Sequence, residues 1–132
     1  MGSPAARKDD RVTGIDVHIV IVPAPPGGTM PLPHPFSGQI KSGTVASVLI
    51  EGAEAATVDS VAKNEPAHIP TPPGTSFSTP PANEGKVSQG STTVKIGGKA
   101  AARVGDPVRT CNDPVDADTS AIVSGASKVR IG

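Results

Sequence analysis

Apolar and polar positions follow the same order in one short phrase that the chain repeats. The phrase from Val48 to Val58 aligns without a gap on the phrase from Val94 to Val104. In each copy a β-branched run leads into a glycine-containing turn, and an alanine-rich run follows. Because β-branched residues favour strands and glycine permits the positive φ of a tight turn, each copy predicts a β-hairpin.

A third copy of the phrase is divided between the two ends of the chain. Its first half is Val129 to Gly132, and its second half is Gly2 to Arg7. Such a division is expected when the last segment returns beside the first and closes a figure with approximate three-fold symmetry. The sequence therefore predicts an all-β fold built from repeated hairpins, with the two termini together at one end. This shape would suit a cap on a trimeric partner.

Three long segments, residues 11–43, 60–90 and 106–124, separate the hairpins. The first two of them are rich in proline, for example from Pro31 to Pro35. Because proline fixes φ and has no N–H to donate, the pattern predicts long Pro/Gly-rich loops rather than helices or central strands. Only the stretch from Ile15 to Val22 is apolar enough to add a strand. No segment predicts a helix.

The composition predicts one domain, residues 1–132, with a thin core. The chain has no Trp or Tyr and only two Phe, while Gly and Pro together number 15 + 15 of 132 residues. This composition leaves disorder as an alternative, which the strand-like repeats disfavour. Small domains with poor cores often rely on a metal or on disulfides. A single cysteine excludes an internal disulfide, so a metal is the remaining candidate.

The charges and the apolar pattern argue against binding to nucleic acid, a membrane span and a signal peptide. Twelve basic and twelve acidic residues cancel, and no stripe of Lys or Arg is present, which argues against binding to nucleic acid. The chain also lacks an apolar stretch near 18 residues and lacks a charged-then-apolar start. The sequence therefore predicts neither a membrane span nor a signal peptide.

The candidate metal ligands are distributed over the three separating segments. His18 and His34 lie in the first, His68 in the second and Cys111 in the third. His18 follows Asp10 by eight residues, and His68 follows Ser60, the counterpart of Asp10 in the next unit, by eight residues. Cys111 follows the third counterpart, Asp106, by five residues. The three segments are therefore expected to converge. Three imidazoles and one thiolate form a complete tetrahedral set for one structural Zn²⁺. The alternative is that each histidine is an ordinary buried polar residue.

Catalysis has little support in the sequence. The chain lacks the G-x-S-x-G turn of a serine hydrolase, and its histidines lie in proline-rich segments. Cys111 beside a histidine could act as a nucleophile, but it serves better as a metal ligand. A zinc hydrolase with one water ligand stays open as a minor alternative. The acidic residues lack the pattern of a calcium loop and are expected in solvated turns. We therefore expect no enzyme activity.

The repeated phrase resembles the motif that names the PAAR-repeat proteins, and the resemblance runs from Gly2 to Gly132. One copy is the motif itself, the second is close to it and the third is weaker. The motif residues and their counterparts in the other copies are Pro4, Ala5, Ala6, Arg7, Gly52, Ala55, Ala56, Gly98, Ala101, Ala102 and Arg103.

The resemblance implies a small pseudo-three-fold β-cone that caps the spike of a contractile injection apparatus. The spike would be a trimer, VgrG-like in a type VI secretion system or phage-tail-spike-like in a related particle, and would carry one monomer of this chain. An apical Zn²⁺ would be held by His18, His34, His68 and Cys111. The cone would help to pierce the target membrane, which it would touch only transiently.

The resemblance also implies where the protein acts. The tip would be assembled in the cytoplasm and then delivered outside the cell or into a target cell. Residues 1–132 show no effector extension, so a toxin would be separate cargo. This leaves an alternative function, an adaptor that docks such cargo onto the spike.

Overall fold

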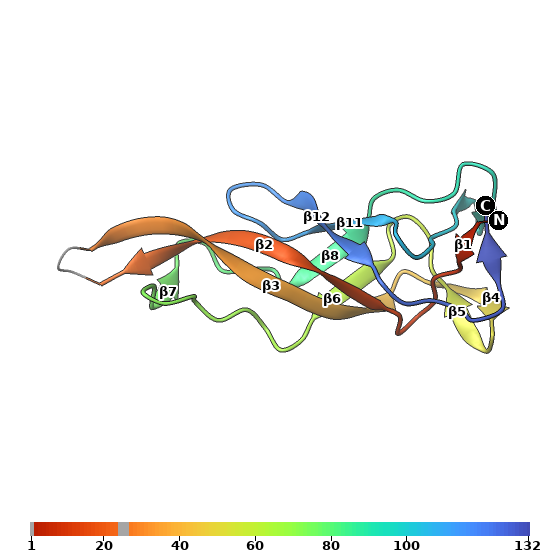
Figure 1. Cartoon of the computed structure of the whole chain (residues 1–132), viewed down its shortest axis with the longest axis horizontal. Coiled ribbons are helices and arrows are strands. Elements are labelled where there is room, and N and C mark those ends of the chain that lie inside the picture. Colours follow the sequence, from red (N-terminus) through yellow and green to blue (C-terminus); the bar gives the residue numbers. More distant parts are fainter. Residues whose placement is uncertain (1, 24–26) are drawn as a thin grey trace.

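The computed structural model describes residues 2–23 and 27–132, and in this part of the chain it contains strands and no helix (Figure 1). The predicted all-β fold is confirmed. The strands in chain order are β1 Ser3–Pro4, β2 Arg11–Val22, β3 Gly28–Ser42, β4 Val45–Ile50, β5 Ala53–Ala55, β6 Val61–Asn64, β7 Ser76–Phe77, β8 Glu84–Val87, β9 Lys95–Ile96, β10 Lys99–Ala100, β11 Pro107–Thr110, β12 Ala117–Ile122 and β13 Arg130–Ile131.

Six of these strands form a closed, barrel-like sheet. Its order is β12-β11-β8-β6-β3-β2, and an antiparallel pairing of β12 with β2 closes it. The strand β7 adds to β2 beyond the barrel, at Val20 and Ile21. The prediction that the three separating segments are loops was wrong, because these segments supply all six strands of the barrel. The apolar stretch predicted as an extra strand lies within β2.

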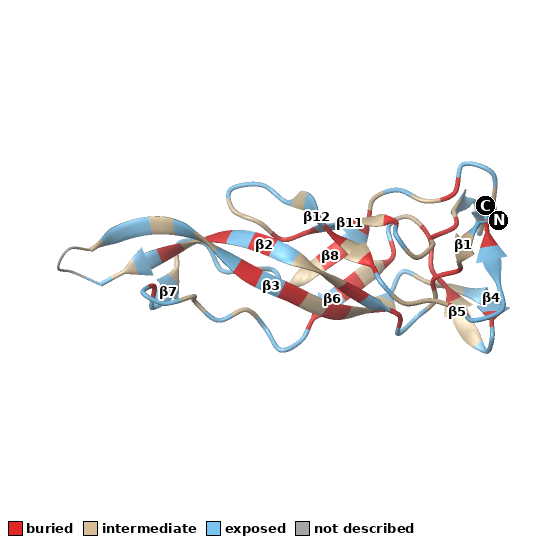
Figure 2. Cartoon of the chain, in the orientation of Figure 1, coloured by how far each residue is buried: buried red, intermediate tan, exposed pale blue. Residues whose placement is uncertain are grey.

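The prolines of β3 are compatible with a strand because they occupy every second position, so that all of them face the same side. From His34 to Ile40 the even-numbered residues of β3 are buried, whereas Pro31, Pro33 and Pro35 are exposed. Figure 2 shows this alternation of burial along β3. The carbonyl of Pro33 accepts a hydrogen bond from Thr71 Oγ1 at 2.9 Å, on the side of β3 away from β2. Since N–H and C=O of one strand residue point the same way, these prolines remove no hydrogen bond between β2 and β3.

The three repeated hairpins form the base of the molecule, which we define as the pairs β4/β5, β9/β10 and β1/β13. The two ends of the chain meet there, with Ser3 opposite Ile131 (Figure 1). The predicted closeness of the termini is therefore confirmed. At the opposite end of the barrel the β2/β3 hairpin extends well beyond the other strands.

A closed ring of backbone hydrogen bonds joins the three copies. The N–H of Ala6 donates to the carbonyl of Ala102, Ala102 donates to Ala56, and Ala56 donates back to Ala6, at 3.0, 3.0 and 3.1 Å. All three side chains are fully buried. Small, fully buried methyl side chains leave room for three backbones to come this close, which gives a physical reason for the central alanine of the motif.

The motif arginines hold the turn that follows this ring. Asp10 accepts a hydrogen bond from the backbone N–H of Arg7 at 2.7 Å and from its Nε at 3.2 Å. Arg103 and Asp106 repeat both contacts at the same distances. Hydrogen bonding to the aspartate raises the pKa of each arginine. In the remaining copy the corresponding residues are Thr57 and Ser60, which have shorter side chains, and the backbone N–H of Thr57 donates to Ser60 Oγ.

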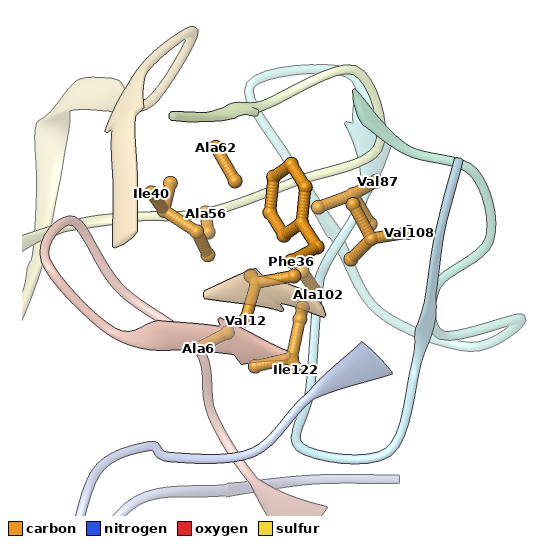
Figure 3. Packing of buried hydrophobic residues seen from close by; sticks show 10 residues of the cluster. All are labelled: Ala6, Val12, Phe36, Ile40, Ala56, Ala62, Val87, Ala102, Val108 and Ile122. Carbon is orange, nitrogen blue, oxygen red and sulfur yellow. The ribbon is translucent and has the colours of Figure 1, made fainter. Parts of the chain in front are cut away.

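The barrel encloses a core of small side chains with one aromatic ring (Figure 3). Phe36 is 1% exposed and its ring points into this cluster. A second, smaller cluster fills the base and includes Ile50 and Ile131. The barrel core consists of Ala6, Val12, Phe36, Ile40, Ala56, Ala62, Val87, Ala102, Val108 and Ile122.

Replacing Gly38 by Ala is expected to destabilise the barrel. A Cβ at this position would lie 2.0 Å from the carbonyl oxygen of Lys63 on the neighbouring strand β6, so the two strands must move apart. Overpacking of this kind costs about 3 kcal/mol in the free energy of unfolding, measured by urea denaturation. The control is Gln39→Ala on the outward face of β3, which should cost less than about 1 kcal/mol. Equal losses in the two variants would contradict the close approach.

Candidate metal centre

The predicted metal ligands come from four places near the end of the barrel that lies away from the base. His18 lies on β2 and His34 on the paired strand β3, with both side chains facing inward. His68 lies in the connection after β6, and Cys111 directly follows β11. The first, second and third separating segments therefore do converge, as the sequence predicts.

A four-residue cluster of possible metal ligands is present at this point. It consists of Asp16, His18, His68 and Cys111, and one donor atom from each lies within 4.8 Å of all the others. Asp16 is fully buried, and His18 and Cys111 are 2% and 3% exposed. Three of the four residues are among the predicted ligands, and Asp16 is an addition.

His34 lies against this cluster, but its two nitrogens have partners elsewhere. Nδ1 donates to the carbonyl of Leu32 at 2.9 Å, and Nε2 accepts the backbone N–H of Thr71 at 3.1 Å. Its ring centroid lies 5.5 Å from that of His18 and 5.6 Å from that of His68. The assignment of His34 as a zinc ligand therefore stays a prediction.

Asp16 is the residue of the cluster that the sequence analysis missed. Its Oδ1 accepts hydrogen bonds from the hydroxyls of Thr110 and Thr119, the second at 3.1 Å. Its Oδ2 accepts a hydrogen bond from His68 Nε2 at 2.9 Å and lies 3.5 Å from Cys111 Sγ. A signal was available, because Asp16 precedes His18 by two positions and so shares its face of β2.

In the absence of a cation, burial favours the neutral forms of Cys111, His18 and His34. Burial, and then the charge of Asp16, raise the pKa of the Cys111 thiol to about 11. Burial is also the main cause that lowers the pKa of His18 and of His34. A divalent cation would reverse this preference at Cys111, because a metal-bound thiol loses its proton.

The chemistry of the donors fits a metal ion, and zinc in particular. His18 Nε2 is buried and has no hydrogen-bond partner among the described residues. Such an atom is costly to bury, and a metal would satisfy it. Imidazole, thiolate and carboxylate are the donors that Zn²⁺ takes in proteins. Bound there, the ion would link β2, the connection after β6 and the end of β11.

Two cavities border the centre and give access to it. One of about 430 Å³ has His34 and His68 in its wall. The other, of about 190 Å³, is lined in part by His18, Cys111 and Asp113. A buried metal site needs an entry path, and these cavities provide routes from two sides.

The fold and the cluster together define a small all-β protein with a pseudo-three-fold base and a buried site consistent with zinc. Residues 78–132 match the family model described as PAAR motif. The ring through Ala6, Ala56 and Ala102 shows that the part before residue 78 contributes equivalent copies. The match over residues 78–132 supports a PAAR-repeat protein.

None of the curated proteins matches the chain significantly. The described residues contain no helix that is long and apolar enough to cross a membrane.

Proposed function

We propose that this protein is the tip of the spike in a contractile injection apparatus. The PAAR motif supports a spike-tip role. The observation that carries the proposal is the closed ring through Ala6, Ala56 and Ala102, which gives one chain a base with three similar sides. Such a base can make three similar contacts with the end of a homotrimer, so one chain suits one trimeric spike.

The surface proposed to meet the spike is the base. Leu49 on β4 is 62% exposed, and Val48 and Val129 are each 36% exposed. Exposed apolar side chains of this kind are typical of an interface with another protein. The short hairpins of the base also present strand edges, to which the strands of a spike can add through backbone hydrogen bonds.

The proposed mechanism is mechanical and assigns the chain no catalytic step. The apparatus, assembled in the cytoplasm, drives the spike outward, and the end opposite the base meets the target membrane first. That end is the β2/β3 hairpin, which extends beyond the barrel. The four-residue cluster ties three separate segments together at the end of the barrel from which this hairpin extends. A bound zinc ion would strengthen this tie, so that the tip keeps its shape under load.

A complex with the trimeric spike protein of the same organism tests the proposal. Native mass spectrometry should give one chain per trimer, and a different ratio would contradict the three-fold argument. Leu49→Asp should weaken the complex by at least tenfold, because it places a charge on the apolar base. Ile69→Asp is the matched control, since Ile69 is 78% exposed and lies in the connection after β6, outside the base; it should leave the affinity unchanged.

A second candidate function, an adaptor for a separate toxin, has one observation in its favour. The cavity of about 430 Å³ has an apolar wall that includes Pro66, Ile69 and Pro70, and it is remote from the base. An adaptor predicts that Ile69→Asp abolishes cargo delivery and leaves the spike complex intact. Normal delivery by this variant would remove the support for cargo binding at the cavity.

A further inference from the structure

We propose that the outer face of the β2/β3 hairpin is a lipid-binding surface that enters the hydrocarbon of a bilayer. The hairpin extends beyond the barrel at the end opposite the base (Figure 1). This inference rests on the proposed function, in which that end meets a membrane, and it names the surface and the chemistry that binds. The surface, which we call the apolar ribbon, consists of Ile15, Val17, Ile21, Pro31, Pro33 and Pro35.

The side chains of the apolar ribbon lie together on one face of the hairpin. Ile15 is opposite Pro35, and Val17 is opposite Pro33. Residues directly opposite each other in an antiparallel pair point to the same side of the sheet. Ile15 is 50% exposed, and Val17 and Ile21 are 39% and 40% exposed. These residues therefore form one continuous apolar surface rather than single exposed side chains.

No exposed charge interrupts the apolar ribbon. Between Arg11 and Lys41 the sequence contains one charged residue, Asp16, and its side chain is fully buried. The base is different, because Lys95 on β9 and Arg130 on β13 are exposed there. A charged side chain in hydrocarbon is costly, whereas a protein interface accommodates charges at its rim. The apolar ribbon therefore suits lipid better than the base does.

The outer edge of β3 lacks donors that would oppose entry into hydrocarbon. In the described part of the chain β3 pairs with β6 only from Gly38 onward, so its earlier residues have no strand on this side. The backbone groups of Pro31, Pro33 and Pro35 point to this edge, and proline has no N–H. An unpaired backbone N–H is costly in hydrocarbon. The three prolines therefore lower the cost of moving the hairpin out of water.

The outer edge of β2 satisfies its backbone by hydrogen bonding instead. The N–H of Val17 donates to Asn112 Oδ1 at 2.6 Å. The carbonyl of Val17 accepts the N–H of Asp113 at 2.8 Å, and Ser78 donates in the same way to the carbonyl of Ile19 at 2.9 Å. These contacts replace water along β2, as a surface that enters a bilayer requires.

The prolines also argue against a strand of another protein as the occupant of this surface. Strand addition uses the alternating N–H and C=O groups of a free edge, and three successive outward-pointing positions of β3 offer no N–H. Protein interfaces contain about one hydrogen bond per 100 to 200 Å², and the apolar ribbon has no polar side chain to supply them. A bilayer interior requires neither feature.

A single tryptophan in the apolar ribbon tests the proposal, because the chain has no Trp of its own. Ile21→Trp is mixed with phosphatidylcholine vesicles. Its emission should shift to shorter wavelength and should be quenched by brominated acyl chains. The matched control is Val48→Trp on β4 of the base, since Val48 is 36% exposed and Ile21 is 40% exposed. Its emission should not change. An unchanged emission from Ile21→Trp would overturn the proposal.

Sedimentation of the wild-type protein with sucrose-loaded phosphatidylcholine vesicles needs no variant. More than about half of the protein should bind at about 1 mM lipid, as for a partition constant similar to that of one myristoyl chain. Added salt should not release it, because the apolar ribbon carries no charge. Binding that requires anionic lipid and is lost in salt would indicate electrostatic adsorption and would overturn the proposal.

Charges placed on the apolar ribbon should prevent this binding. Val17→Glu combined with Ile21→Glu should lower vesicle binding by at least about tenfold. The control is Val123→Glu, since Val123 is 50% exposed and follows β12, outside both the apolar ribbon and the base. It should bind vesicles as the wild type does, and circular dichroism shows whether each variant is folded. Equal losses in the two variants would contradict the assignment of the surface.

The outcome for lipid binding is separable from the outcome for the tip function. The spike complex is proposed to form at the base, so the charged variants of the apolar ribbon should still give one chain per trimer. A protein that forms this complex but does not bind vesicles would overturn the lipid-binding surface and leave the tip function intact. Binding of a separate cargo protein, but not of vesicles, to the apolar ribbon would assign the surface to a protein and would also overturn the proposal.

Discussion

Treating the zinc-loaded wild-type protein with a chelator is expected to lower its melting temperature by more than about 10 °C. Structural zinc contributes roughly 10 to 16 kcal/mol of apparent binding free energy in small peptides, and even a tie worth about 4 kcal/mol produces such a shift in a domain of this size. The core of the protein is poor in large side chains, so little else replaces the tie. The measurement is differential scanning calorimetry before and after treatment with a chelator.

Cys111→Ser should reproduce this effect without a chelator, since a hydroxyl is a poor substitute for a thiolate in a zinc site. Restoring Zn²⁺ to the stripped wild-type protein should restore its melting temperature, and adding Mg²⁺ should not. A melting temperature that is indifferent to both the chelator and the substitution would show that the four-residue cluster carries no structural metal.

Phe36→Ala is expected to cost about 3 to 5 kcal/mol in the free energy of unfolding. Phe36 is 1% exposed and is the only aromatic side chain in the barrel core, where its neighbours are alanine, valine and isoleucine. Small neighbours joined by a closed sheet cannot move inward to fill the space that the ring leaves. Urea denaturation, followed by circular dichroism, measures the loss.

The other phenylalanine provides the control. Phe77 on β7 is half-buried and lies beside His18 and His34, outside the barrel core. Phe77→Ala should therefore cost less than half as much as Phe36→Ala. Equal costs would mean that the barrel core has no special dependence on its single large side chain.

The base could be predicted from the sequence because its information is local. Each tight turn needs positive φ values, which Glu51 with Gly52 and Gly97 with Gly98 both adopt. The divided third copy predicted the meeting of the ends, which the pairing of Ser3 with Ile131 confirms. Repetition made the three-fold arrangement readable, since each copy specifies the same turn and the same close approach.

The barrel could not be predicted in the same way, because its proline signal depends on which side each residue faces. Proline at Pro31, Pro33 and Pro35 argues against a central strand when the partners of that strand are unknown. In the structure the backbone groups of these prolines point away from β2, so the same spacing is compatible with a strand of 15 residues. That placement is a property of tertiary structure, which the local pattern does not contain.

The candidate site was predicted in part for a related reason. The scarcity of His and Cys pointed to His18, His68 and Cys111, and the structure brings these three together. Asp16 is one of twelve acidic residues, so its type alone carried no signal. Only the strand that places it two positions before His18 shows that it faces the same site.

At the point where each long hairpin of the barrel begins and ends, the same backbone hydrogen bond joins its two sides. The N–H of Ile40 donates to the carbonyl of Asp10, and the other two hairpins repeat this bond at 3.0 and 3.1 Å, from Val87 to Ser60 and from Ile122 to Asp106. This hydrogen bond fixes where each hairpin begins and ends, but it does not fix the length of the hairpin. The three arms can therefore differ in length and chemistry at the far end of the molecule without any change in the geometry of the base.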